Sequence, residues 1–103
     1  MGIEEQKIAG YFSDIHLQPD SPTPYYLQLA EQLLNRICRY HLPPGTRLPD
    51  IKTLAAMLNV SIKTTNSAYN ELLRDNVCIR RAQKGTFVAS STVCDINSYR
   101  FLA

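Results

Sequence analysis

The sequence predicts a mainly α-helical fold with a small antiparallel β-wing, that is, a winged helix-turn-helix. The observations that predict it all lie between residues 42 and 88. Two short amphipathic helical patterns meet at a three-residue turn, which is the arrangement of a helix-turn-helix. Two strand-like runs around a basic turn follow at residues 77–81 and 86–89 and predict a hairpin. Helices and hairpin in this order suit the binding of a DNA duplex.

Each helix of the motif is preceded by a residue that can cap it. Asp50 precedes the first helix, which Asn59 ends. Ser61 precedes the second helix, which runs to about Asp75. A capping side chain accepts a hydrogen bond from an N–H group that the first turn leaves unpaired. The apolar sides of the two helices comprise Ile51, Leu54, Ala55 and Leu58, and then Val60, Ala68 and Leu72.

A longer helix and a short strand are expected before the motif. From about Tyr25 to His41, apolar residues recur at helical spacing, so this helix should pack beneath the motif. We expect Tyr69 to pack against it, with its hydroxyl at a wet edge. Residues 46–49 can form a strand that pairs with the hairpin and ties the wing to the core.

The chain divides into three parts. Residues 1–23 form an N-terminal arm, either helical or extended, followed by a proline-rich linker. Residues 24–89 form the winged helix-turn-helix domain. Residues 90–103 form a short tail and a candidate dimerisation element. Either the arm supplies part of the dimer interface, or the chain has been cut.

Composition narrows the class of protein. The 103 residues, 45% hydrophobic and 19% charged, fit one globular domain without a catalytic or ligand-binding module beside the motif. The formal net charge is only +2, so attraction to DNA must come from local clusters of cations. No set of nucleophile, base and orienting residue is present, which argues against an enzyme.

Cysteine usage and hydropathy indicate the compartment. Three cysteines without paired CxxC spacing favour reduced thiols over a disulfide framework or a structural zinc site. We therefore expect no metal and no cofactor. No apolar run approaches the roughly 20 residues that cross a bilayer, and the acidic N-terminus is unlike a signal peptide. A cytoplasmic protein with no membrane partner is expected.

Several runs of residues also resemble one protein family. They are Tyr26-Leu27-Gln28-Leu29-Ala30-Glu31-Gln32-Leu33, Leu42-Pro43-Pro44-Gly45-Thr46-Arg47-Leu48-Pro49, Leu54-Ala55, Asn59-Val60-Ser61, Ala68-Tyr69-Asn70-Glu71-Leu72 and Lys84-Gly85-Thr86-Phe87-Val88. In this register the chain resembles the DNA-binding domain of GntR-type bacterial transcription regulators. The run that begins at Ala68 is most similar to the short YtrA-type branch. The pyridoxal-phosphate-dependent branch, which carries an aminotransferase-like domain, has a similar head.

The resemblance implies a bacterial regulator that lies on the nucleoid when bound. The chain departs from the family pattern at four positions. Many members have arginine at the positions of Lys52, Ile62 and Asn66, and glycine at that of Gln83. We therefore do not expect this protein to bind the same operator sequence as the relatives that carry these arginines.

The start of the second helix is expected to enter the major groove. Its free N–H groups and positive dipole end attract phosphate, and its first turn reaches base edges. Lys63 can bind phosphate or guanine, Thr64 phosphate or a thymine methyl, and Asn66 adenine. A hydroxyl bonded back to its own helix is the alternative for Thr65, and a solvated side chain is the alternative for Lys52. The expected helix contacts are Lys52, Ser61, Lys63, Thr64, Thr65 and Asn66.

The hairpin tip is expected to lie along the duplex and enter the minor groove, whose acceptor-rich floor attracts cations. Arg80 and Arg81 alternate faces, so at most one points at DNA, and we favour Arg81 together with Lys84. Gly85 permits positive φ and a close approach to the DNA backbone. The expected wing contacts are Arg81, Gln83, Lys84, Gly85 and Thr86.

These residues predict a sequence-specific DNA-binding transcription regulator, most simply a repressor. One small winged helix buries little surface, so we expect a homodimer on a two-fold operator in double-stranded DNA. The alternative is the DNA-binding head or a fragment of a pyridoxal-phosphate-dependent regulator. A third hypothesis is an interaction module whose helix-turn-helix binds a protein instead of DNA. The sequence identifies neither an effector nor the operator.

Overall fold

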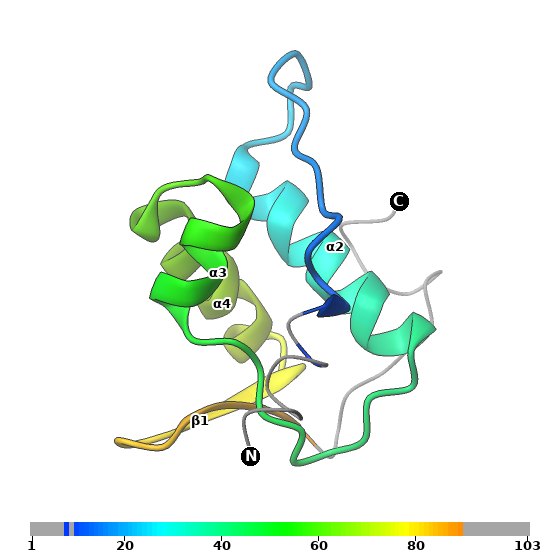
Figure 1. The fold of residues 1–103 in the computed structure, drawn as a ribbon, viewed down its shortest axis with the longest axis vertical. Coiled ribbons are helices and arrows are strands. Elements are labelled where there is room, and N and C mark those ends of the chain that lie inside the picture. Colours follow the sequence, from blue (N-terminus) through cyan, green and yellow to red (C-terminus); the bar gives the residue numbers. More distant parts are fainter. Residues whose placement is uncertain (1–7, 9, 90–103) are drawn as a thin grey trace.

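The computed structural model describes residues 8 and 10–89 of the chain. In Figure 1 the labelled helices are grouped above a β-hairpin. The elements, in chain order, are α2 (Tyr25–Arg39), α3 (Ile51–Leu58), α4 (Ile62–Arg74), β1 (Cys78–Arg81) and β2 (Gly85–Val88). This is the winged helix-turn-helix that the sequence predicts.

Helix α2 begins after a proline and ends earlier than expected. Pro24 occupies the position before the first turn, where a missing N–H costs nothing. The helix ends at Arg39 because His41 adopts a left-handed conformation with φ 52°. Its inner face buries Leu29, Ala30, Leu33, Leu34 and Ile37.

Both predicted caps of the helix-turn-helix are present. The N–H of Thr53 donates to Oδ1 of Asp50 at 2.9 Å, and the N–H of Thr64 donates to Oγ of Ser61 at 2.9 Å. Asn59 ends α3 in a left-handed conformation with φ 56°, which asparagine tolerates better than most residues. The turn between α3 and α4 is therefore set by the main-chain conformation of Asn59 on one side and by the Ser61 cap on the other.

The hairpin is antiparallel, with Cys78 opposite Val88 and Arg81 opposite Gly85. The strand expected at residues 46–49 is reduced to a single bridge between Arg47 and Phe87. Two hydrogen bonds of 2.9 Å flank it, from Leu48 N–H to the Thr86 carbonyl and from Val88 N–H to the Thr46 carbonyl. Proline at position 49 has no N–H to continue the ladder. The wing is thus tied to the core as predicted, over a shorter segment.

The core lies between α2 and α4, with α3 packed against α4. Tyr69 is fully buried in it, and its hydroxyl donates to the carbonyl oxygen of Pro49. Burial raises the pKa of this hydroxyl. The expectation of a wet edge for the hydroxyl is therefore wrong, because the main chain before α3 supplies the partner that water would have supplied.

The arm packs against α2 in a turn and an extended stretch. Phe12 is fully buried and Ile15 is nearly so, both within the core cluster. Asp14 pairs with the largely buried Arg36 at 3.0 Å. The hydrogen bond from Arg36 lowers the pKa of the Asp14 carboxyl. The described part of the arm therefore contributes to the same core as the helices.

The proline-rich linker is held by one side chain of α2. The amide of Gln28 accepts from Gln18 N–H at 2.7 Å and donates to the Gln18 and Thr23 carbonyls at 3.1 and 2.8 Å. These three bonds satisfy linker groups that have no strand partner. The tail, residues 90–103, lies outside the described residues.

Candidate nucleic-acid interface

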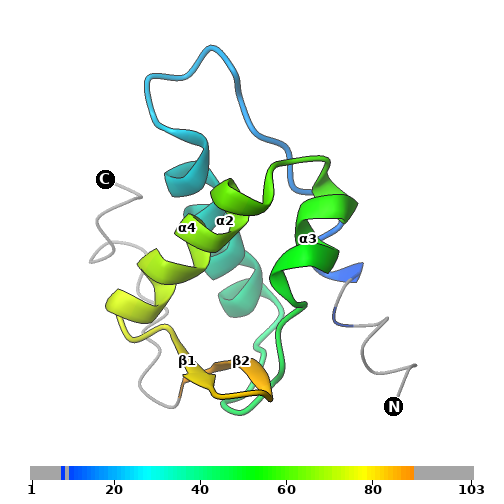
Figure 2. The same ribbon diagram turned by 90° about the vertical axis from the view of Figure 1, so that its left-hand side faces the viewer.

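One face of the molecule carries both the start of α4 and the wing. In Figure 1 the hairpin tip and the turn between α3 and α4 project to the same side. Figure 2 looks onto this side and shows α4 in front of α2, with the hairpin below it. Residues on the outer side of α4 and at the hairpin tip can therefore meet one large partner together.

The first turn of α4 presents polar groups in a fixed arrangement. Lys63 is exposed, and Asn66 is half-buried one turn further along the helix. The Ser61 hydroxyl accepts from Thr64 N–H and donates to Oγ1 of Thr64 at 2.8 Å, so the two hydroxyls orient each other. Lys52 is exposed near the start of α3. Five predicted side chains are thus exposed or half-buried on the surface of the helix-turn-helix.

Two predicted site residues are buried instead. Thr65 has no exposed surface, and its hydroxyl donates to the Ser61 carbonyl at 3.1 Å. Thr86 is also buried, since it faces the core from β2. Thr65 therefore offers no surface to a duplex, and Thr86 offers little. The hydroxyl of Thr65 bonds back to its own helix, which is the alternative expected for it, and Thr86 lies at the inner wall of the hollow between the wing and α3.

The wing tip depends on two residues with positive φ. Gly85 has φ 121°, as expected for its role, and Gln83 has φ 64°. The positive φ of Gln83 was not predicted, although the glycine that many family members have at this position indicates it. The N–H of Lys84 donates to the Arg81 carbonyl at 3.0 Å and closes the turn. Gln83 and Lys84 are exposed at the tip.

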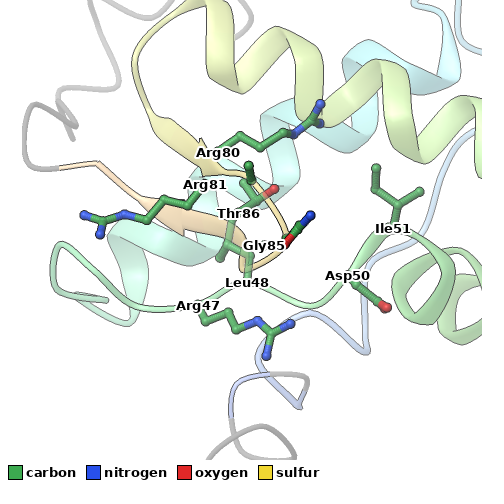
Figure 3. Close-up of a pocket in the computed structure, with 10 residues that line it drawn as sticks. Arg47, Leu48, Asp50, Ile51, Arg80, Arg81, Gly85 and Thr86 are labelled. Carbon is green, nitrogen blue, oxygen red and sulfur yellow. The ribbon is translucent and has the colours of Figure 1, made fainter.

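The two wing arginines extend to opposite sides of the hairpin (Figure 3). The Arg81 guanidinium lies over the ring of Phe87, 5.7 Å from its centroid. Such a contact holds a cation by its attraction to the aromatic ring and leaves its edge open to further partners. Arg80 follows the opposite face, which also carries Cys78. The structure thus confirms that the two side chains alternate.

A cation that sequence reasoning missed lies between the wing and α3. Arg47 is exposed and lines a hollow of about 240 Å³ together with Asp50, Arg80 and Arg81 (Figure 3). A Cβ on Gly85 would lie 3.0 Å from Nε of Arg47. Glycine at position 85 therefore makes room for this arginine. The predicted pairing of residues 46–49 with the hairpin was the signal that could have placed Arg47 here.

The charge of this face exceeds what the net charge suggests. Its exposed cations are Arg47, Lys52, Lys63, Arg80, Arg81 and Lys84. Asp50 lies among them, and the hydrogen bonds from Thr53, with smaller effects of Arg47 and Lys52, lower the pKa of its carboxyl. Clustered cations raise the local positive potential without a large net charge.

Metal-binding clusters and membrane-spanning helices are absent from the described residues. No group of three His, Cys, Asp or Glu side chains in residues 8 and 10–89 is arranged to hold a metal ion. Within the same residues, no helix has the length and apolar character needed to cross a membrane. Cys78 is a buried thiol, and burial raises its pKa to about 12.

Comparison with known sequences identifies relatives over the same residues. YhcF of Bacillus subtilis, an uncharacterized HTH-type transcriptional regulator, is 36% identical over 70% of this chain. The transcriptional repressor YtrA of Bacillus subtilis is 29% identical over 75% of it. The chain spans 60% and 59% of these two relatives. The probable rhizopine catabolism regulatory protein MocR of Rhizobium meliloti is 36% identical over 72% of this chain, which covers 15% of MocR.

Solved structures share the fold. YtrA from Sulfolobus acidocaldarius, a GntR-family transcription factor, has a TM-score of 0.65, with 39% identity over 77% of this chain and 82% of its own. The DNA-binding domain of AraR, in complex with operator ORX1, has a TM-score of 0.65 with 26% identity over 73% of this chain and 93% of its own. Residues 25–88, more than half of the chain, match the family described as bacterial regulatory proteins, gntR family. The chain belongs to the GntR family, and its described part is a DNA-binding domain of that family.

Proposed function

We propose that this chain is a sequence-specific transcription regulator, and specifically a repressor that binds a two-fold operator as a homodimer. The observation that carries the proposal is the single face on which the start of α4 and a basic wing lie together. The AraR domain, whose structure contains its operator, supports DNA as the partner. The similar protein YtrA of Bacillus subtilis is a transcriptional repressor, which supports repression. Its place of action is the bacterial cytoplasm, on the nucleoid when bound.

The helices supply both reading and positioning contacts. Asn66 pairs with an adenine edge, because a side-chain amide matches the donor and acceptor that adenine presents in the major groove. Lys63 and Lys52 bind phosphates, which fix the register of the protein on the duplex. Ser61 and Thr64, whose hydroxyls orient each other, and the free N–H groups of this turn also face a phosphate.

The wing supplies cations to the neighbouring groove. Arg81 and Lys84 bind phosphates or the minor-groove floor, and Gln83 and Gly85 bring the main chain close. Arg47, which lines the hollow behind the tip, adds a third cation to this group. Truncating any one of these cations removes a contact that is insensitive to base sequence.

Dimerisation follows from the size of the domain. A single module of this kind buries too little surface for strong specificity, and two half-sites about one helical turn apart double the base contacts. Either the arm or the tail supplies the interface, and no effector is proposed.

A second candidate rests on the MocR match. The chain corresponds to 15% of that much longer relative at 36% identity, so the same head is compatible with a pyridoxal-phosphate-dependent regulator. The reading frame downstream of residue 103 distinguishes the short regulator from the pyridoxal-phosphate-dependent regulator. An aminotransferase-like domain continuing after residue 103 would replace the short-regulator proposal with this one.

Salt titration of DNA binding tests the proposed function. About six phosphate contacts per dimer predict a slope of about −5 for log K against log salt, because bound cations release counterions. Fluorescence anisotropy on a labelled duplex measures it, and the triple variant K63A/R81A/K84A serves as the comparison. A shallower slope for the variant supports the proposal. A slope near zero for the unmodified protein would remove these cations from the interface.

A further inference from the structure

Ile62 is the most exposed large hydrophobic side chain among the described residues. It is 54% exposed, whereas the next three, Tyr25, Tyr40 and Ile79, are 40–41% exposed. It is also the first residue of α4, immediately after the Ser61 cap. A single exposed isoleucine is common on protein surfaces, so its position on the helix decides its meaning.

The side chain is held in a defined place. The bonds between Ser61 and Thr64 fix the first turn of α4, and a β-branched side chain in a helix has one strongly preferred rotamer. Residues four apart lie on the same side of a helix, so Ile62 stands next to Asn66. The exposed Lys63 adjoins both. An apolar group with a preferred rotamer therefore stands beside the residue proposed to read adenine.

The major groove limits what such a group can recognise. Base pairs present hydrogen-bond donors and acceptors there, and the C5 methyl of thymine is the apolar group among them. An aliphatic side chain gains by covering that methyl, whereas against a guanine or cytosine edge it would bury polar groups without a partner. The chemistry of Ile62 thus selects one base.

We propose that Ile62 is a specificity-determining residue that selects a thymine in each half-site by contact with its C5 methyl. The inference rests on the proposed function, because it assumes that the start of α4 enters the major groove. It adds an apolar reader to the polar one at Asn66. The preferred half-site then contains a thymine within reach of the first turn of α4.

Removal of the methyl from DNA tests the contact directly. A preferred duplex is first selected from a random pool with the full chain. Each thymine of the half-sites is then replaced by deoxyuridine, which pairs identically but lacks the C5 methyl. We expect one thymine per half-site whose replacement weakens binding about fourfold, the effect of about one buried methylene-sized group. Ile62→Ala should weaken binding to the thymine duplex and lose the response to deoxyuridine.

Ile79→Ala is the matched control, since Ile79 is an exposed isoleucine on β1 rather than on α4. It should keep the full response to deoxyuridine, and circular dichroism should confirm that both variants are folded. If no duplex is selected from the pool, the proposed function fails. If a duplex is selected but no replacement matters, or Ile62→Ala keeps the response, the proposed function stands and the inference about Ile62 is overturned.

Discussion

The first turn of α4 and the tip of the wing lie on one face of the protein, but they are held in different ways. The turn of α4 rests on the core: Thr65 is fully buried beneath it, and the Ser61 hydroxyl accepts from the N–H of Thr64. The tip of the wing extends beyond the core. It is closed by the main chain, through the bond between Lys84 and Arg81.

The difference suits two tasks. Reading a base edge requires donors, acceptors and apolar groups at fixed positions, because a misplaced group gains nothing. Binding a phosphate requires only charge nearby, which a long flexible side chain provides. A rigid α4 and an extended basic wing therefore imply that specificity comes mainly from α4 and salt-dependent affinity mainly from the wing.

The largest expected effect separates the two regions by stability. Leu72→Ala should lower the free energy of unfolding by about 2–5 kcal/mol, because it leaves a cavity under α4. Lys84→Ala should leave it unchanged within about 0.5 kcal/mol, because Lys84 is exposed at the wing tip. Urea denaturation followed by circular dichroism measures both. Equal losses would mean that the wing is packed like the core, and the comparison would fail.

The next effect separates them by specificity. Asn66→Ala should weaken binding to the operator by roughly 1–3 kcal/mol and binding to random duplex little, because it removes a base-edge pair. Lys63→Ala and Lys84→Ala should weaken both by similar factors, because phosphates carry no sequence. Anisotropy titrations on selected and random duplexes give the ratio. An equal loss on both duplexes for Asn66→Ala would leave reading to the wing, to Thr64 or to DNA shape.

Local patterns along the chain predicted most of the fold. The caps at Asp50 and Ser61, the break at Asn59 and the pairing of the wing with residues 46–49 are confirmed, because each depends on neighbouring residues or on a short register. The arm was left open between helix and extended chain. Its burial against α2 depends on contacts between distant residues, such as Asp14 with Arg36, that local spacing does not report.

The candidate site was predictable at the level of elements and less so at the level of side chains. Thr65 and Thr86 were placed on DNA because they lie in the correct turn and strand, but a threonine suits either face of an element, and both face inward. Arg47 was missed for the converse reason. It lies far from the tip in sequence, and only the cross-strand register brings it beside Gly85.

A smaller effect compares the two caps that frame the helix-turn-helix. Ser61→Ala and Asp50→Ala should each cost about 1 kcal/mol of stability near neutral pH. The pKa of the Asp50 carboxyl is lowered by its hydrogen bonds from Thr53. Its stabilisation is therefore complete above the unfolded pKa of about 3.9 and is lost as the pH falls through the lower folded pKa.

The two variants should then respond differently to acid. The cost of Asp50→Ala should shrink below pH ~4, whereas that of Ser61→Ala should stay constant, because a serine hydroxyl does not titrate there. Urea denaturation of the unmodified protein and both variants at neutral and acidic pH gives the two differences. A pH-independent cost for Asp50→Ala would show that its carboxylate charge does not contribute to the cap.

The smallest effect tests whether the wing tip is strained. Gln83 has φ 64°, a conformation that glycine adopts without steric cost. Gln83→Gly should therefore raise the free energy of unfolding by about 0.5 kcal/mol. This value is what remains of the relieved strain once the greater entropy of glycine in the unfolded chain is subtracted. Ala82→Gly is the matched control and should lower stability. Thermal unfolding measures both, and a loss for Gln83→Gly would mean that the glutamine side chain stabilises the turn. If Gln83→Gly raises stability but weakens DNA binding, the Gln83 side chain makes the DNA contact proposed for it. Relief of strain explains the higher stability, and loss of the side chain explains the weaker binding.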